Sequence, residues 1–400
     1  MSSRPLGPIT LLALGVNGIV GVGIFVAPPT VARAFPGAGG ALLYPAIAIA
    51  CLPVALVYAR LSRAFPTDGG PALYAARAFG PHAASAIGAV VWVSALFSSA
   101  AVTRALADRF GHATIAIALA VVLAVVNLRG LRLSAWAWTA LTLAKLTPLI
   151  VLAAYGLTAS PARALPGTYQ PVARGAAMLA VLFALQGFEI VALPAGQARD
   201  PEKNVPRATI GALLAAGLLY ALVHLACARG LPMLASSKGP IPEAAAALGG
   251  RGLARAIDAG VTASIGGIVI GMHAMTPRYL AAITSERESE VPRIAILVTA
   301  LTIGLLCMLS TLPELLSLSS IAVLAQFATT AAALMVLAGR RVAGLTNRDL
   351  WPAPLALAVV AVLLSQALLK EIAVAAAVAL AGAILARFLA APSGITRPPG

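Results

Sequence analysis

The chain has 400 residues, of which 60% are hydrophobic and only 10% are charged, and its mean hydropathy is +0.95. A soluble domain of this length does not bury so much apolar surface, so the composition excludes a soluble globular protein and predicts a polytopic membrane protein. The net charge of +15 comes from Lys and Arg scattered between apolar runs, with no basic stripe that carries interleaved aromatics. We therefore expect no nucleic-acid partner.

Twelve uncharged or nearly uncharged runs follow one another along the chain, and each predicts a membrane-spanning helix. Stretches rich in Pro and Gly separate several of them, as turns do. Lys and Arg are more frequent on the side that holds the N-terminus, which predicts that both termini are cytoplasmic. The runs cover residues 5–32, 34–59, 78–103, 110–128, 133–158, 175–198, 208–228, 259–277, 294–313, 315–339, 350–369 and 372–386.

The first run contains a glycine-rich segment, Gly15 to Phe25, in which four of eleven residues are glycine. Each glycine costs about 1 kcal/mol of helix stability relative to alanine. Two interpretations remain open. Small residues allow membrane helices to pack closely, and a broken helix presents bare backbone groups to a cavity in many transporters.

The sixth run is interrupted as well, because Gln186, Gly187, Glu189 and Pro194 fall in the middle of an apolar segment. An ionisable residue at this depth costs a few kcal/mol and usually faces a cavity or a partner. The two interrupted runs stand five spans apart, an odd number, which predicts two inverted repeats. We expect one transporter domain over 1–400, with repeats at 5–158 and 175–339 and two further helices within 350–390.

Six motifs follow one another in order along the chain. They are the segments 21–25, 65–71 with Tyr74 and 78–80, 145–149, 183–189, 200–208 and 278–282. Together they resemble the amino acid–polyamine–organocation (APC) superfamily of secondary transporters over nearly the whole chain. The resemblance implies an all-α, LeuT-like fold with broken helices 1 and 6. The sequence departs from the family at Arg60 and at Gln197, where a glutamate is common, so the inner gate is expected to be paired differently.

The resemblance also implies a substrate site at the two breaks. Backbone amides of the first break would bind the carboxylate of an amino acid, and carbonyls of the second would bind its amino group. Phe183 stands where family members often place an aromatic gate, although ordinary packing is the alternative. The expected substrate-binding residues are Gly18, Ile19, Gly21, Val22, Gly23, Phe183, Ala184, Leu185, Gly187 and Glu189.

Two titratable residues are candidates for proton coupling. Lys145 lies about 20 Å along the fifth run from Arg132, too deep for its side chain to reach the cytoplasmic surface easily. Burial disfavours the charged ammonium. In relatives that couple to protons, a lysine at the matching position replaces a sodium ion. The alternative is that Lys145 stays charged, pairs with carbonyls of the first break and only stabilises the fold. For Glu189, a protonatable role and a structural role as a helix cap or pairing partner are equally open.

The predicted function is secondary active transport of an amino acid, proton-coupled and sodium-independent, with a neutral amino acid favoured. A cationic amino acid or polyamine, with Glu189 as counter-ion, is the alternative, and a channel is the rival outside carriers. Ser317, Ser319 and Ser320 offer modest polarity to the substrate. The runs contain no HExxH, GxSxG or paired Asp, and the three cysteines lack metal-ligand spacing, so we expect no enzyme activity, metal or cofactor. Protons and membrane lipids are the other expected partners. The expected location is the bacterial inner (plasma) membrane. The oligomeric state and the direction of transport stay open.

Overall fold

The computed structural model describes residues 6–67, 69–112, 114–130, 135–158, 174–284, 289 and 291–389. Within these residues the secondary structure is helical, and the β-type pairing is an isolated parallel bridge between Leu6 and Ala198. Seven helices of the described chain are long and apolar enough to span a membrane, or eight if the bent pair Pro8–Ile19 and Gly23–Ala34 counts as one span. The predicted all-α polytopic membrane protein is confirmed at this level.

Most helices that precede residue 159 overlap the first five apolar runs, and α5 lies mostly between the second run and the third. The pair α3 and α4 shares one run and is separated at Cys51. The elements are α1 (Pro8–Ile19), α2 (Gly23–Ala34), η1 (Gly37–Leu42), α3 (Leu43–Ala50), α4 (Leu52–Ala64), α5 (Gly70–Phe79), α6 (Pro81–Arg109), α7 (Thr114–Leu128) and α8 (Ala135–Thr158), where η denotes a 3₁₀ helix.

The long helices after residue 173 overlap the remaining runs, and the short helices η5, η6 and η7 lie between runs. Gly250 has φ 78° and ψ −176°, so α11 consists of two helices joined at a kink. The elements are α9 (Arg174–Leu185), η3 (Phe188–Ala192), η4 (Ala195–Gln197), α10 (Pro201–Gly230), η5 (Leu234–Ser236), α11 (Pro240–Ala281), α12 (Arg293–Leu309), α13 (Leu312–Gly339), η6 (Val342–Gly344), η7 (Asn347–Asp349), α14 (Pro352–Leu364) and α15 (Leu369–Leu389).

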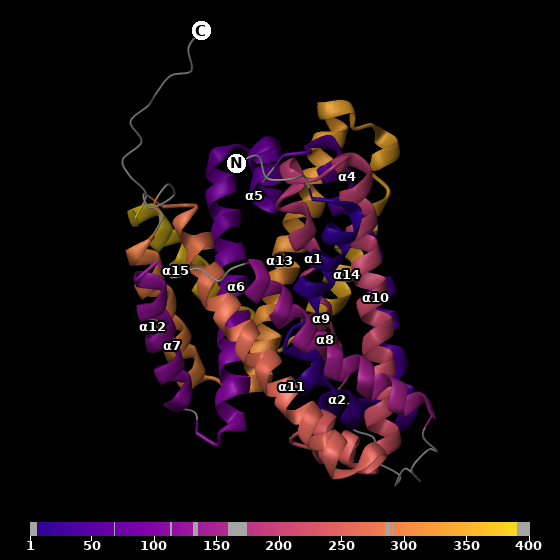
Figure 1. The fold of residues 1–400 in the computed structure, drawn as a ribbon. Helices are drawn as coiled ribbons and strands as arrows, with labels where there is room; N and C mark the ends of the chain where they lie inside the picture. The colour runs from indigo at the N-terminus through magenta and orange to yellow at the C-terminus, as the bar shows by residue number, and fades with distance from the viewer. Residues whose placement is uncertain are drawn as a thin grey trace.

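The helices pack so that the two interrupted ones lie inside the bundle. α1 contacts α10 and α2 contacts α9, while α6 contacts both α11 and α13. Figure 1 shows α7, α12 and α15 on one side of the bundle, beside α6, and α10 on the other side. α5 lies at the upper end in this view, and α2 lies at the lower end with the first part of α11.

Aromatic side chains fill the core between α4, α5 and α13. The ring of Tyr58 makes edge contacts with Tyr74, Phe188 and Phe327, with centroid separations of 6.1 to 6.4 Å. All four rings are at most 1% exposed. Phe188 belongs to the segment that follows the second helix break, so this cluster anchors that segment to the surrounding helices.

Candidate functional site

The first helix break lies between Ile19, where α1 ends, and Gly23, where α2 begins, and the two axes are bent by 53°. The hydroxyl of Tyr220, on α10, donates a hydrogen bond to the Ile19 carbonyl at 3.1 Å. Tyr220 is fully buried, so a group from another helix satisfies a carbonyl that the break exposes.

The second break follows Leu185, the last residue of α9. Gly187 has φ 115°, a left-handed conformation that glycine adopts without a steric penalty, and the 3₁₀ helix η3 begins at the next residue. The Gly187 N–H, which in a continuous helix would bond to the carbonyl four residues earlier, donates to the Glu189 carboxylate at 2.9 Å. Glu189 therefore caps the break from within its own segment.

The glycines at the two breaks fall into two groups with different surroundings. A Cβ on Gly18 would lie 2.9 Å from the Gly187 carbonyl oxygen, and one on Gly23 would lie 2.5 Å from the Ala184 Cα. A Cβ on Gly21 would find only the Ile19 carbonyl oxygen nearby, at 3.7 Å. Gly18, Gly23 and Gly187 thus allow the two backbones to touch, while Gly21 faces open space. The close-packing interpretation applies to Gly18, Gly23 and Gly187, and Gly21 differs from them.

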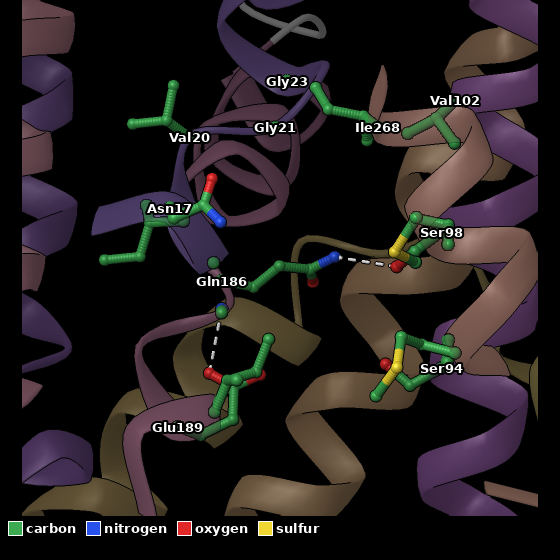
Figure 2. Close-up of a pocket in the computed structure, with 18 of the residues that line it drawn as sticks. Asn17, Val20, Gly21, Gly23, Ser94, Ser98, Val102, Gln186, Glu189 and Ile268 are labelled. Atoms are coloured by element: carbon green, nitrogen blue, oxygen red, sulfur yellow. Dashed lines mark hydrogen bonds between the residues drawn. The ribbon is translucent and has the colours of Figure 1, made fainter. Parts of the chain in front are cut away.

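A cavity of about 500 Å³ lies between the two breaks and the helices α6 and α11. Pro71 of α5 also lines it. Figure 2 shows Gln186 on one side of the cavity and Ser94 and Ser98 of α6 on the other. Of the expected substrate-binding residues, it is lined by Gly18, Ile19, Gly21, Val22, Gly23, Phe183, Gly187 and Glu189. The other two are not among the lining residues: Ala184 packs against Gly23, and Leu185 is fully buried.

The residues that α6 and α11 contribute to the cavity wall are not among those expected from the sequence. Ser94 and Ser98 of α6 and Ser264 of α11 bring hydroxyl groups to it, and Gln326 of α13 and Gln186 bring amides. A signal for the first two exists in the sequence, because serines four residues apart share one face of a helix. This spacing occurs in α6, which is not one of the two broken helices. Ser319 contacts this wall, whereas the Ser320 hydroxyl donates to the Leu179 carbonyl instead.

The remaining sequence-derived candidates lie outside the cavity or outside the described residues. Lys145 is a residue of α8, but its side chain is not among the described parts of the structure. Arg60 forms an ion pair with Asp349 at 2.7 Å, which Arg63 joins at 3.1 Å. The Gln197 carbonyl accepts a hydrogen bond from the Leu6 N–H at 2.8 Å. Arg60 thus ties α4 to η7.

Charge on the cavity wall is sparse. Among the described lining residues Glu189 is the one that carries a charge, and most of the wall is apolar. No group of three or more His, Cys, Asp or Glu side chains is gathered as metal ligands within the described residues. One carboxylate and several neutral hydrogen-bonding side chains on a mostly apolar wall suit the binding of a small polar molecule.

A bundle of apolar helices with a central cavity between two interrupted helices defines the class of the protein as a helical membrane transporter. The chain belongs to the amino acid permease family, whose family model matches residues 6–391. The APC resemblance inferred from the motifs is thereby confirmed, and the protein is an amino acid transporter rather than an enzyme.

Individual relatives are consistent with this assignment. The serine/threonine exchanger SteT of Bacillus subtilis is 25% identical over 308 residues, which cover 71% of this chain and 69% of the relative. An uncharacterized transporter of Mycobacterium tuberculosis is 30% identical over 359 residues, 84% of this chain and 80% of the relative. The chloroplastic cationic amino acid transporter 9 of Arabidopsis thaliana is 25% identical over 313 residues, 69% of this chain and 54% of the relative.

Proposed function

We propose that this transporter moves a neutral amino acid across the membrane by alternating access, with the substrate backbone held between the two helix breaks. The observation that carries the proposal is that both breaks line the same cavity of about 500 Å³. The first amides of α2 at one break suit a carboxylate, and the last carbonyls of α9 at the other suit an ammonium group. Gly21 leaves open space where a side chain would otherwise stand, which gives the carboxylate room to approach.

The sparse charge of the cavity supports a neutral side chain. An acidic side chain would meet the Glu189 carboxylate without a described Lys or Arg on the wall to pair with it. The name of the Bacillus relative, a serine/threonine exchanger, points to neutral amino acids as well. The second candidate substrate is a cationic amino acid or polyamine, carried by an exchanger or antiporter. The position of Glu189 in the cavity and the name of the Arabidopsis relative favour it.

The proposed architecture is twelve membrane-spanning helices in the inner membrane of a bacterium, with both termini cytoplasmic. Residues 5–158 and 175–339 form inverted repeats of five spans, and 350–390 adds two more. Both breaks lie at corresponding places in these repeats, in the first span of each. Under this topology the cavity, which extends toward Pro71, faces the cytoplasmic side.

Coupling to protons without sodium completes the proposal, with Lys145 as the proton carrier and Glu189 as the other titratable candidate. Its support is the position of a lysine deep within an apolar run. Lys145→Ala should lose accumulation driven by a pH gradient in proteoliposomes while still exchanging substrate. Accumulation that depends on sodium, or a Lys145→Ala protein that is still driven by protons, would contradict this mechanism.

A counterflow experiment tests the transport function itself. Purified protein in liposomes preloaded with unlabelled amino acids should show faster uptake of the same labelled amino acid, because a carrier exchanges its substrate. A panel of amino acids tested as thermal stabilisers identifies the substrate beforehand, since a ligand that binds the folded state raises the melting temperature. A channel would show no such trans-stimulation, and that result would exclude the carrier.

A further inference from the structure

A cluster of three neutral polar side chains connects the second helix break to the opposite wall of the cavity. The Gln186 amide nitrogen donates hydrogen bonds to the hydroxyls of Ser98, at 3.1 Å, and Ser319, at 2.9 Å. The two hydroxyl oxygens lie 2.7 Å apart, within one hydrogen bond. Figure 2 shows the Gln186 side chain extending from the broken helix toward Ser98 on α6. We call these residues the Gln186 triad.

The hydrogen bonds of the triad do not use all of its donors and acceptors. The amide supplies two N–H donors and each serine supplies one O–H donor. The two amide hydrogens and one hydroxyl hydrogen are engaged within the triad, so the second hydroxyl hydrogen has no acceptor there. The Gln186 Oε1 atom is buried without a hydrogen-bond partner in the described part of the chain. The triad therefore retains an unused hydroxyl hydrogen as a donor and an unused amide oxygen as an acceptor.

The surroundings make these unused groups costly. The cavity that the triad borders is lined by the apolar side chains of Val91, Val102, Ile268 and Met272. Ser264, which lines the cavity from α11, has a buried hydroxyl oxygen that also lacks a partner among the described residues. An unpaired polar group in an apolar environment loses the hydrogen bonds that water would give it. A ligand that supplies both a donor and an acceptor would remove that cost.

We propose that the Gln186 triad is the side-chain subsite of the transporter and selects amino acids whose side chain carries a hydroxyl, as in serine and threonine. A hydroxyl accepts the unused hydrogen through its oxygen and donates its own hydrogen to Gln186 Oε1 or Ser264 Oγ. The inference rests on the proposed function, because it takes the substrate backbone to lie between the two breaks. Gln186 directly precedes Gly187 of the second break, so a short side chain reaches the triad from that backbone site.

Other side chains fit the triad less well. An aliphatic side chain would leave the donor and the acceptor unpaired after water has been excluded. An ammonium or guanidinium group would bring several donors and a full charge to three neutral residues. A site that hydrogen-bonds a substrate hydroxyl discriminates strongly against an analogue that lacks it, much more than an apolar pocket discriminates by size.

Threonine and valine provide the test, because they have nearly the same shape and differ in one hydroxyl. We expect threonine to bind at least about tenfold more tightly than valine. Two measurements give the ratio of their dissociation constants: competition against labelled substrate in proteoliposomes, and thermal stabilisation of the purified protein at increasing ligand concentration. The same measurements on Ser98→Ala, Ser319→Ala and Gln186→Leu should reduce that preference to about threefold or less. Asparagine tests whether a carboxamide substitutes for the hydroxyl, and arginine tests the cationic alternative.

The matched control is Ser320→Ala. Ser320 is adjacent to Ser319, equally buried at 0% exposure, and donates to the Leu179 carbonyl instead of the triad. Its loss should lower the melting temperature about as much as Ser319→Ala does and leave the preference for threonine intact. If Ser320→Ala reduced the preference equally, the effect would be one of general packing and the subsite would be refuted.

The remaining outcomes separate this inference from the proposed function. Equal binding of threonine and valine by the unmodified protein, with amino acid counterflow present, would overturn the subsite and leave neutral amino acid transport standing. A preference unchanged in all three triad variants would overturn it as well. Strong preference for asparagine or arginine over threonine would assign the triad to another substrate class. Absence of counterflow with every amino acid would contradict the transport proposal and the subsite together.

Discussion

Each helix break leaves a backbone group without its helical partner, and the two groups are satisfied from different places. At the first break, the Ile19 carbonyl accepts a hydrogen bond from Tyr220, about 200 residues later in the chain, on α10. At the second, the Gly187 N–H donates to Glu189, two residues later. The first break is thus held by tertiary packing and the second by a local cap. The difference predicts that the same kind of substitution has different consequences at the two sites.

The glycines at the breaks differ in a similar way. Gly187 has a positive φ, and a Cβ on it would collide with the backbone of the first break. Gly23 has no positive φ, but a Cβ on it would collide with the backbone of Ala184. Gly21 has neither feature. Substitutions at these positions therefore separate backbone strain, crowding between helices and obstruction of the cavity. The following predictions use these contrasts, in order of decreasing effect.

Gly187→Ala should have the largest effect. Its Cβ would collide with the Gly18 carbonyl oxygen, and alanine would be forced to a φ of 115°. Overpacking costs about 1–3 kcal/mol and a left-handed conformation about 1–2 kcal/mol more. The control is Gly250→Ala, which has φ 78° but open space around its Cβ. Thermal melts in detergent should show a much larger loss for Gly187→Ala, and equal losses would disprove the collision.

Gly23→Ala should destabilise the protein by about 1–3 kcal/mol, because a Cβ there would lie 2.5 Å from the Ala184 Cα. Gly21→Ala should leave the melting temperature nearly unchanged, since its nearest neighbour is 3.7 Å away. Gly21→Leu should fold and insert but lose substrate binding, because the side chain would enter the cavity. Undiminished binding by Gly21→Leu would show that this glycine does not lie at the substrate.

Tyr220→Phe should cost about 1–3 kcal/mol, since it removes only the hydroxyl that pairs with the buried Ile19 carbonyl. Tyr74→Phe is the control, because the Tyr74 hydroxyl is buried without a partner in the described residues. Melting temperature and substrate Kd should change for the first variant and not for the second. If both variants behave alike, the first break does not depend on α10.

Glu189 variants should show the smallest effect if the residue acts as a cap. Glu189→Ala leaves the Gly187 N–H unpaired and should cost about 1 kcal/mol, whereas Glu189→Gln retains an acceptor and should cost less. Binding of a neutral amino acid to Glu189→Gln should stay within about threefold of the unmodified protein. Loss of neutral-substrate binding in Glu189→Gln alone would show that the charge itself is required.

The sequence by itself determined the elements and the class. Apolar runs long enough to span a bilayer have few alternatives to helix, because every backbone group in lipid must be satisfied within the chain. Clustered glycines in one run, and Gln186, Gly187 and Glu189 in another, located both interruptions. These signals are local, since glycine weakens helices wherever it stands and a polar side chain in lipid requires a cavity or a partner.

Only the tertiary structure decided which residues meet at the cavity. Gly21 and Gly23 are indistinguishable in a sequence pattern, and the position of Ala184 separates them. Ser98 and Ser319 come from two helices and Gln186 from the second break, and no spacing along the chain brings them within a hydrogen bond of one another. The same holds for Tyr220 and Ile19. Contacts between distant segments depend on how helix faces pack, and an almost uniformly apolar sequence carries little information about which faces meet.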